Sequence, residues 1–204
     1  MTDVEQTMRD ILEAESRAVA AIPVTGDYGR AVKMIVEHVW DNKGKLITSG
    51  MGKAGQIAMN IATTFSSTGI PSVFLHPSEA QHGDLGIMQD NDIMLLLSNS
   101  GKTREILELV TLAKNLNPAL KIIVITGNND SELASIADVC LWTGNSPEVC
   151  PLGLTPTTST TLMTVIGDVL VVNVMKATGF TKEMYAMRHH GGYLGKKSRG
   201  ENEK

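Results

Sequence analysis

Cysteine, aromatic residues and basic charge are all scarce in this sequence of 204 residues. The two cysteines, Cys140 and Cys150, fit neither a disulfide framework nor the spacing of a metal site. Aromatic residues make up 4% of the chain, the formal net charge is −4, and no basic stretch alternates with aromatic residues. We therefore expect no nucleic-acid partner, no anionic membrane surface and no bound metal.

Long apolar runs and a secretion signal are missing as well. No uninterrupted apolar run reaches the ~18 residues of a membrane span. The first twenty residues carry acidic side chains throughout and lack the layout of a signal peptide. These absences predict a cytoplasmic protein with reduced thiols. Hydrophobic residues make up 42% of the chain, and its length suits a single α/β domain with a sizeable core.

Short apolar segments alternate with amphipathic ones through the middle of the chain. The segments IMLLL (93–97) and IIVI (122–125) are apolar at every position, which indicates strands buried on both faces. The pattern predicts a three-layer α/β/α, doubly wound, five-stranded parallel sheet. The expected strands are 45–48, 72–76, 92–97, 121–126 and 139–143, and the expected helices between them are 56–67, 103–115 and 131–137.

Helices are also expected at both ends of this region. A capping box, Thr2 with Glu5, opens a helix that ends near Ile22, and a second helix over 28–40 completes an N-terminal helical hairpin. Later in the chain, Thr155 as N-cap and Pro156 at the first helical position start a long apolar helix.

The first glycine-rich stretch, SGMGKAG (49–55), follows an expected strand and spells G-x-G-x-x-G, as dinucleotide-binding turns do. Glu79 stands about 20 residues later, where a ribose-binding acid would be. The match is weak because Lys53 lies inside the motif and Glu79 follows Pro77 in a polar turn. No nicotinamide cofactor is expected.

The second polar stretch, SNSGKTRE (98–105), favours a phosphate ester. Its Gly-Lys-Thr resembles the end of a nucleotide-binding P-loop, but Leu96 stands where that loop requires glycine. Hydroxyl groups and free backbone amides before a helix suit a single phosphate group. The expected substrate-binding residues are Ser49, Gly52 and Ala54 in the first stretch and Ser98, Asn99, Ser100 and Thr103 in the second.

Five motifs occur in one order along the chain: GMGK, HGDLG, SNSG, CPLGLTPTTST and GGYLG. In combination they resemble the sugar isomerase (SIS) domain of arabinose-5-phosphate isomerases, over about residues 5–197. The resemblance implies one SIS-fold domain over 1–197, with a disordered tail over 198–204. It also implies interconversion of D-ribulose 5-phosphate and D-arabinose 5-phosphate without a cofactor, which supplies the synthesis of Kdo, an acid sugar of Gram-negative lipopolysaccharide.

The resemblance implies four catalytic residues, which are Lys53, Glu105, Glu148 and His189, and His82 beside Gly83-Asp84 is a fifth candidate that could instead orient its loop. Isomerisation requires a base that moves a proton between neighbouring carbons and groups that stabilise an enediolate. We expect Glu148 to be that base, with His189 as the alternative, and Lys53 to stabilise the enediolate. His189, with His82, would help to open the sugar ring, and Glu105 would orient a hydroxyl or a neighbouring catalytic group.

The chain departs from this family at two site positions. Ala54 replaces a serine that commonly follows GMGK, and His190 replaces the proline of an HPGG turn, which loosens the turn that holds His189. The chain also ends before the CBS regulatory domains that many of these isomerases carry. We therefore expect regulation to act at the sugar site or at a subunit interface, and a sugar or sugar-nucleotide inhibitor, where one exists, to bind at the active site.

Two rival functions remain open at this point. One is an SIS isomerase for a hexulose or heptose phosphate, and the other is a sugar-phosphate sensor without catalysis. A sensor is disfavoured because the chain keeps every acid–base residue and no DNA-binding segment is visible. The resemblance also implies a homo-oligomer, a dimer or a tetramer, with crevices completed across subunits.

Overall fold

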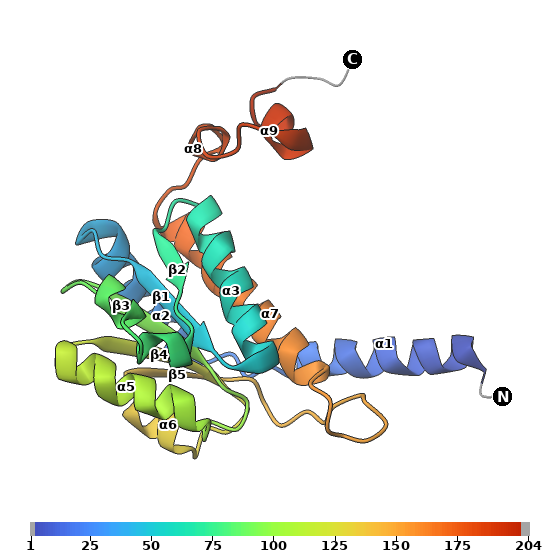
Figure 1. The fold of residues 1–204 in the computed structure, drawn as a ribbon. Helices are drawn as coiled ribbons and strands as arrows, with labels where there is room; N and C mark the ends of the chain where they lie inside the picture. Colours follow the sequence, from blue (N-terminus) through green and yellow to red (C-terminus); the bar gives the residue numbers. More distant parts are fainter. Residues whose placement is uncertain (1–2, 201–204) are drawn as a thin grey trace.

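A five-stranded parallel sheet forms the centre of the computed structural model, which describes residues 3–200 (Figure 1). The strand order is β2-β1-β3-β4-β5, and all neighbouring strands are parallel. From β1 the chain goes to β2 on one side and then to β3 on the other, so the order reverses beside β1. The strands are β1 (Leu46–Gly50), β2 (Ser72–Phe74), β3 (Ile93–Leu97), β4 (Lys121–Thr126) and β5 (Val139–Trp142).

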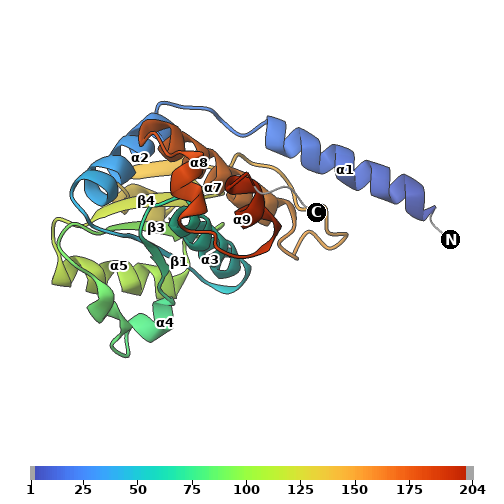
Figure 2. The ribbon, with the colours of Figure 1, turned by 90° about the horizontal axis from the view of Figure 1, so that it is seen from above.

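Helices cover both faces of this sheet (Figures 1 and 2). One face is packed by α2 (Asp27–Ile35), which continues into the π-helical turn η1 (Val36–Asp41), together with α3 (Gly52–Ser67) and α7 (Thr158–Ala177). The other face is packed by α4 (Pro77–Ala80), α5 (Arg104–Leu116) and α6 (Glu132–Ile136). A short 3-10 helix, η2 (Asp84–Ile87), follows α4. The predicted three-layer α/β/α sheet is thus confirmed.

The side chains of β3 show why its run is apolar throughout. Ile93, Leu95 and Leu97 pack with α2, α3 and α7, whereas Met94 and Leu96 pack with α5 on the opposite face. All five side chains are 0% exposed. Because successive side chains of a strand point to opposite faces, a sheet covered on both sides needs apolar residues at every position.

Helix α7 begins later than predicted. Thr155 and Pro156 were expected to start it, but its N-cap is Thr157 and its first helical residue is Thr158. The hydroxyl of Thr157 does not cap the helix; the carboxylate of Glu148, nine residues earlier, accepts from the Thr157 and Ser159 amides instead. A capping partner from another segment leaves no local signal in the sequence.

By length and composition α7 could cross a membrane, but half of its apolar window is buried inside the fold. It packs against α2, α3 and the sheet, as the core helix of a layered domain does.

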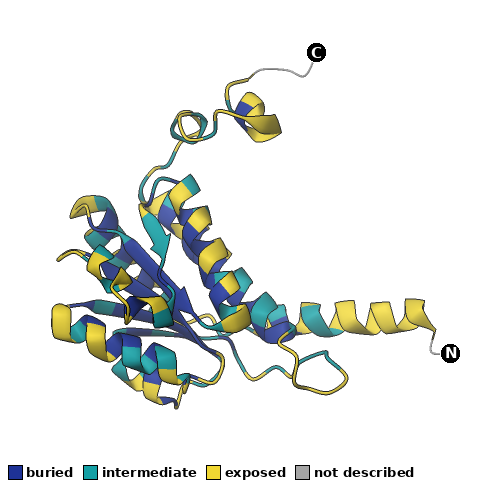
Figure 3. Ribbon diagram, in the orientation of Figure 1, coloured by how far each residue is buried: buried dark blue, intermediate teal, exposed yellow. Residues whose placement is uncertain are grey.

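The N-terminal helices are present but do not form the expected hairpin. Helix α1 (Val4–Ala20) extends away from the body, while α2 packs on the sheet (Figures 1 and 2). The N-cap of α1 is Asp3, whose carboxylate accepts from the Glu5 amide at 3.0 Å; the predicted cap, Thr2, lies outside the described residues. Most of α1 is exposed (Figure 3).

The chain ends in a second projecting segment, α8 (Lys182–Ala186) and α9 (Gly192–Ser198), which we call the C-terminal arm (Figure 1). Ser198, the first residue of the predicted tail, is the last residue of α9. Residues 201–204 of that tail lie outside the described residues.

Candidate active site

A cavity of about 280 Å³ lies at the carboxyl ends of β1 and β3, where the strand order reverses. Open parallel sheets bind ligands at such a reversal. Loops from both strands meet the first turn of α7 there. The structure brings six of the predicted residues to this cavity, which we call the β1–β3 pocket: Lys53, Ala54, Ser98, Asn99, Ser100 and Thr103. Its remaining lining residues are Met51, Leu97, Pro156, Ser159, Thr160 and Met163.

The glycine-rich stretch after β1 is explained by close packing of a strand against a helix. A Cβ atom on Gly55 would lie 2.5 Å from the carbonyl oxygen of Gly50, and one on Gly50 would lie 2.9 Å from the backbone of Ala54. Only glycine therefore lets the first turn of α3 approach the end of β1 this closely. The G-x-G-x-x-G pattern sets the position of Lys53 and Ala54 at the pocket.

The loop after β3 is held by bonds between its own groups. The hydroxyl of Ser98, 2% exposed, is 2.8 Å from the Thr103 hydroxyl and accepts from the Gly101 amide at 3.2 Å. Gly101 has a φ of +63°, and a Cβ atom there would lie 1.9 Å from the hydroxyl oxygen of Ser131. The loop therefore presents its hydroxyls in a fixed arrangement at the start of α5.

Two residues predicted to bind substrate do not line the pocket. Ser49 is fully buried within β1, and its hydroxyl donates to the carbonyl oxygen of Leu75 at 2.6 Å. That bond ties β1 to the end of β2, so the Ser49 hydroxyl is engaged within the sheet, and its role in substrate binding stays a prediction. Gly52 occupies the first position of α3 and shapes the turn.

The start of α7 forms the third side of the pocket; it belongs to the motif CPLGLTPTTST, but none of its residues was predicted as a site residue. Ser159 and Thr160 line the cavity from the first turn, and Pro156 lines it from just before the N-cap. The run of hydroxyl residues in TPTTSTT was the available signal, because hydroxyls at a helix N-terminus are suited to an anion.

Glu148 lies behind this turn rather than in the pocket lining. One carboxylate oxygen accepts from the Thr157 amide at 2.7 Å, the Thr157 hydroxyl at 2.8 Å and the Ser159 amide at 3.2 Å. Burial raises the pKa of Glu148, but the hydrogen bonds from Ser159 and Thr157 outweigh it, so the pKa lies below its usual value. The carboxylate is therefore held in its charged form at the positive end of α7.

The other three predicted catalytic residues lie away from the pocket within one chain. His82 is exposed in the turn between α4 and η2, and Glu105 lies in the first turn of α5 without lining the cavity. His189 stacks on Tyr185 at 3.6 Å in the C-terminal arm, and its Nδ1 lies 2.9 Å from the Tyr185 carbonyl oxygen. Among the residues that line the pocket, Lys53 alone is titratable.

The arm that carries His189 starts at the end of α7 remote from the pocket. The first turn of α7 lines the pocket, and the arm follows its last turn. A helix of 20 residues is about 30 Å long. Figure 1 shows the arm projecting from that remote end. His189 therefore does not reach the pocket of its own chain.

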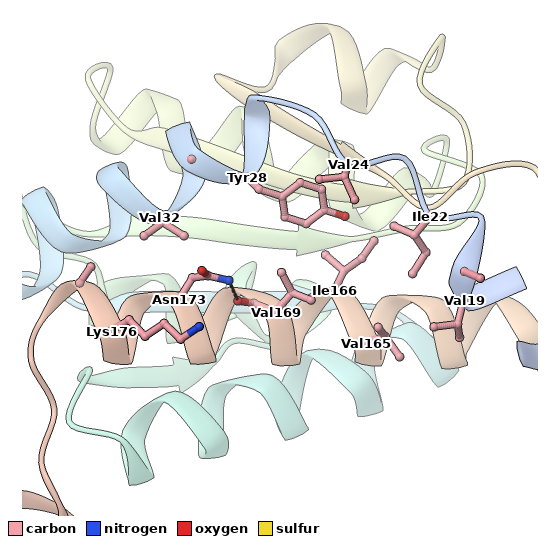
Figure 4. Close-up of a pocket in the computed structure, with 13 residues that line it drawn as sticks. Val19, Ile22, Val24, Tyr28, Val32, Val165, Ile166, Val169, Asn173 and Lys176 are labelled. Carbon is pink, nitrogen blue, oxygen red and sulfur yellow. Dashed lines mark hydrogen bonds between the residues drawn. The ribbon is translucent and has the colours of Figure 1, made fainter.

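A second cavity, of about 740 Å³, is mostly apolar, with Tyr28, Asn173 and Lys176 as its polar lining residues (Figure 4). We call it the α2–α7 groove, because Val32 of α2 and Val169 of α7 face one another across it. Its rim includes Val24, which is 91% exposed. The hydroxyl of Tyr28 is buried beside it and has no hydrogen-bond partner among residues 3–200. Such an apolar lining does not suit acid–base chemistry. Over the same part of the chain, no group of three His, Cys, Asp or Glu side chains could hold a metal ion.

Comparison with known proteins places this geometry in a family. The SIS domain model matches residues 39–173. Arabinose 5-phosphate isomerase KdsD of Yersinia pestis is 42% identical over 197 residues, which cover 96% of this chain and 58% of that protein. The chain thus spans little more than half the length of this curated relative.

Two solved structures are similar over nearly their whole length. One is a Bacteroides fragilis protein assigned provisionally as a phosphosugar isomerase involved in capsule formation; it is 69% identical, with a TM-score of 0.92 over 93% of this chain and 99% of that one. The other is an E. coli CFT073 protein in complex with arabinose 5-phosphate; it is 32% identical, with a TM-score of 0.84 over 92% of this chain and 98% of that one.

Proposed function

The chain belongs to the SIS-domain family, and from that premise we propose that it interconverts D-arabinose 5-phosphate and D-ribulose 5-phosphate. The observation that carries the proposal is the β1–β3 pocket, in which one lysine faces a set of hydroxyls and amides from three loops. The similarity to arabinose 5-phosphate isomerase KdsD and to a protein in complex with arabinose 5-phosphate supports the choice of sugar.

The pocket is suited to a phosphate on one side and an enediolate on the other. Ser100 and Thr103, at the start of α5, present hydroxyls where the positive end of the helix favours an anion. Lys53 reaches the same cavity from α3. A cation in the first turn of a helix is unfavourable for the helix itself, which supports a role for Lys53 towards a negatively charged ligand.

The proton transfer requires a base, and no carboxylate or imidazole lines the pocket directly. Removing a proton from C1 of the ketose leaves an enediolate, and returning a proton to C2 gives the aldose. We assign Glu148 as the first choice for this base, because it adjoins Ser159 at the pocket wall, and His189 as the alternative. His189, Glu105 and His82 would act on the pocket of a second copy.

A second copy also accounts for two exposed apolar surfaces. The face of α1 that is buried against the body at Ala18 continues to Ile11, Met8 and Val4, which are 39%, 56% and 70% exposed. We call Val4, Met8, Ile11 and Leu12 the α1 stripe. We propose that the α1 stripe and the α2–α7 groove are covered when copies of this chain associate, because one chain carries both surfaces and lacks three catalytic groups in its own pocket.

The reaction is tested by proton NMR of D-ribulose 5-phosphate and the purified protein in deuterated water. We expect arabinose 5-phosphate to form without an added cofactor, with deuterium at C2 if the base exchanges its proton with solvent. If the protein converts only a hexulose or heptose phosphate, the reaction class is kept and the proposed pentose substrate is wrong. Saturable binding of these sugars without turnover of any of them would contradict the proposed isomerase and indicate a sugar-phosphate sensor.

The product would feed synthesis of Kdo, as the resemblance of the sequence implies, and the reaction would take place in the cytoplasm. A sugar or sugar-nucleotide inhibitor would bind in the same pocket, where the hydroxyls of the α5 and α7 turns recognise polar ligands.

A further inference from the structure

Two carboxylates converge on the N-terminus of α7, and neither belongs to that helix. Helix α7 has no acidic residue in its first turn. Glu148 approaches from the loop after β5, and Glu15 approaches from α1, 143 residues earlier in the chain than its partner Thr158. Anionic groups are favourable at this end of a helix, so both acids hold the start of α7 in place.

The contact of Glu15 continues into the segment that carries Glu148. The hydroxyl of Thr158, 1% exposed, donates to Oε1 of Glu15 at 2.8 Å. The same hydroxyl accepts from the amide of Val149 at 3.2 Å. Because a hydroxyl has one proton, donation to Glu15 directs that proton away and leaves a lone pair for the Val149 amide. Glu15 thereby fixes a relay of two hydrogen bonds, from the Val149 amide to Thr158 and from Thr158 to Glu15, and Val149 is the residue next to Glu148.

The start of α7 lies between this relay and the β1–β3 pocket. Thr158 is followed by Ser159 and Thr160, which line the pocket, and is preceded by Thr157, which donates twice to Glu148. A shift of Thr158 therefore moves a wall of the pocket and a proposed base together. Few other residues of α1 are tied to the body in this way, since Ala18 is its one buried residue in the described part of the chain.

Burial of Glu15 carries a desolvation cost that packing alone does not explain. Its second oxygen, Oε2, is buried and has no hydrogen-bond partner among residues 3–200. Buried polar atoms without partners are rare in native proteins and call for a reason. An acceptor oxygen is needed here, because it takes the proton of the buried Thr158 hydroxyl.

We propose that Glu15 is a positioning residue for the isomerisation, acting through Thr158 on the Glu148 segment and the α7 wall of the pocket. This inference rests on the proposed function and adds a residue to it that lies outside the pocket.

The test compares kcat and KM for arabinose 5-phosphate in Glu15→Ala, Glu15→Gln and Thr158→Val. We expect Glu15→Ala to lower kcat about 10- to 100-fold, as misplacement of catalytic groups does, with KM changed less than about threefold. Glu15→Gln keeps an acceptor oxygen for Thr158 and is expected to retain activity within about threefold of the wild type. Glu13→Ala, an exposed acid of the same helix, is the matched control and should behave as wild type.

Two further measurements separate positioning from a general loss of structure. Because both substitutions break one relay, Glu15→Ala with Thr158→Val should be no worse than either alone. Hydrogen exchange of the Val149 amide should accelerate in Glu15→Ala and in Thr158→Val but not in Glu13→Ala. A wild-type kcat in Glu15→Ala, additive losses in the double variant, or equal losses in Glu15→Gln and Glu15→Ala would each overturn the proposal.

Failure of the proposed function would look different. If the wild type isomerises no sugar phosphate, the proposed function fails, and exchange at Val149 still tests the relay. Unchanged exchange in Glu15→Ala would then overturn the link itself.

Discussion

The hydroxyls beside the pocket divide into those that hold the loop and those that remain available to a ligand. Ser98 is 2% exposed and bonds to the Thr103 hydroxyl and to the Gly101 amide, so its hydroxyl stabilises the loop. When Ser98 donates to Thr103, the proton of Thr103 is free for an incoming phosphate oxygen. Ser100 accepts from the Lys102 amide and keeps its own proton free as well. We therefore propose Ser100 and Thr103 as the direct donors to a phosphate.

Lys53 provides the sharpest test at the scale of single residues. Lys53→Met should lower kcat about 10²- to 10³-fold, because removing one group that stabilises developing charge has an effect of this order. The thermal midpoint should stay the same or rise slightly, because the change removes a cation from the positive end of α3. Steady-state kinetics and thermal melts measure the two effects separately.

Lys33→Met is the control, since Lys33 is an exposed lysine of α2 far from the β1–β3 pocket. It should leave kcat unchanged. A Lys53→Met variant with kcat within threefold of the wild type would remove Lys53 from the mechanism, whatever its effect on stability.

At the scale of elements, the N-terminus of α7 is capped by Glu148, which lies in the loop after β5. The pKa of Glu148 in the folded protein lies below its ordinary value of 4.5. A lowered pKa means that the unfolded chain binds more protons than the folded one as the pH falls through this range. Glu148 therefore contributes stability above about pH 4.5 that is lost progressively at lower pH.

Glu148→Gln removes this contribution without removing the side chain. We expect the variant to be less stable than the wild type at about pH 7, and the difference to shrink as the pH falls below about 4.5. Urea midpoints of both proteins across this range measure it. A difference that stays constant with pH would mean that the charge at the α7 N-terminus contributes nothing, and that Glu148 is held there only by shape.

The bounds of an element were predicted well where neighbouring residues determine them, and poorly where a distant segment does. Strand β4 has the predicted bounds, 121–126, because its apolar run and the flanking polar residues are contiguous in sequence. The start of α7 was misplaced because its cap, Glu148, is supplied by another segment. The bond of Ser49 could not be foreseen for a related reason, since a hydroxyl in a polar motif does not reveal that its acceptor is the carbonyl oxygen of Leu75.

The pocket itself was largely predictable, because residues that follow neighbouring parallel strands meet at one edge of the sheet. Ser100 was found on that basis and Lys53 from the GMGK motif, and both line the same cavity. His189 could be identified by its motif but not placed. Its arm leaves the domain at the far end of α7, and its position relative to a pocket depends on which chain it faces.

At the scale of the whole molecule, two segments project from an otherwise layered domain, α1 and the C-terminal arm (Figures 1 and 3). Each carries side chains that the single chain does not use: the α1 stripe on one and His189 on the other. Burying apolar surface is the main favourable contribution to association, so the α1 stripe is where assembly is most sensitive to charge.

Leu12→Glu tests whether assembly completes the site. Leu12 belongs to the α1 stripe and is 66% exposed, so the change places a charge on a surface that one chain leaves open. We expect the wild type to be a dimer or tetramer by light scattering and Leu12→Glu to dissociate. Isomerase activity should fall with it, because His189, Glu105 and His82 do not line the pocket of their own chain.

Gln6→Glu is the matched control. It puts the same side chain on the opposite side of α1, where Gln6 is exposed and bonds only to Asp10 among its described neighbours. It should assemble and turn over as the wild type does. A Leu12→Glu protein that is monomeric yet fully active would contradict the shared site, because its catalysis would then have to come from Lys53, Glu148 and the hydroxyls of one chain.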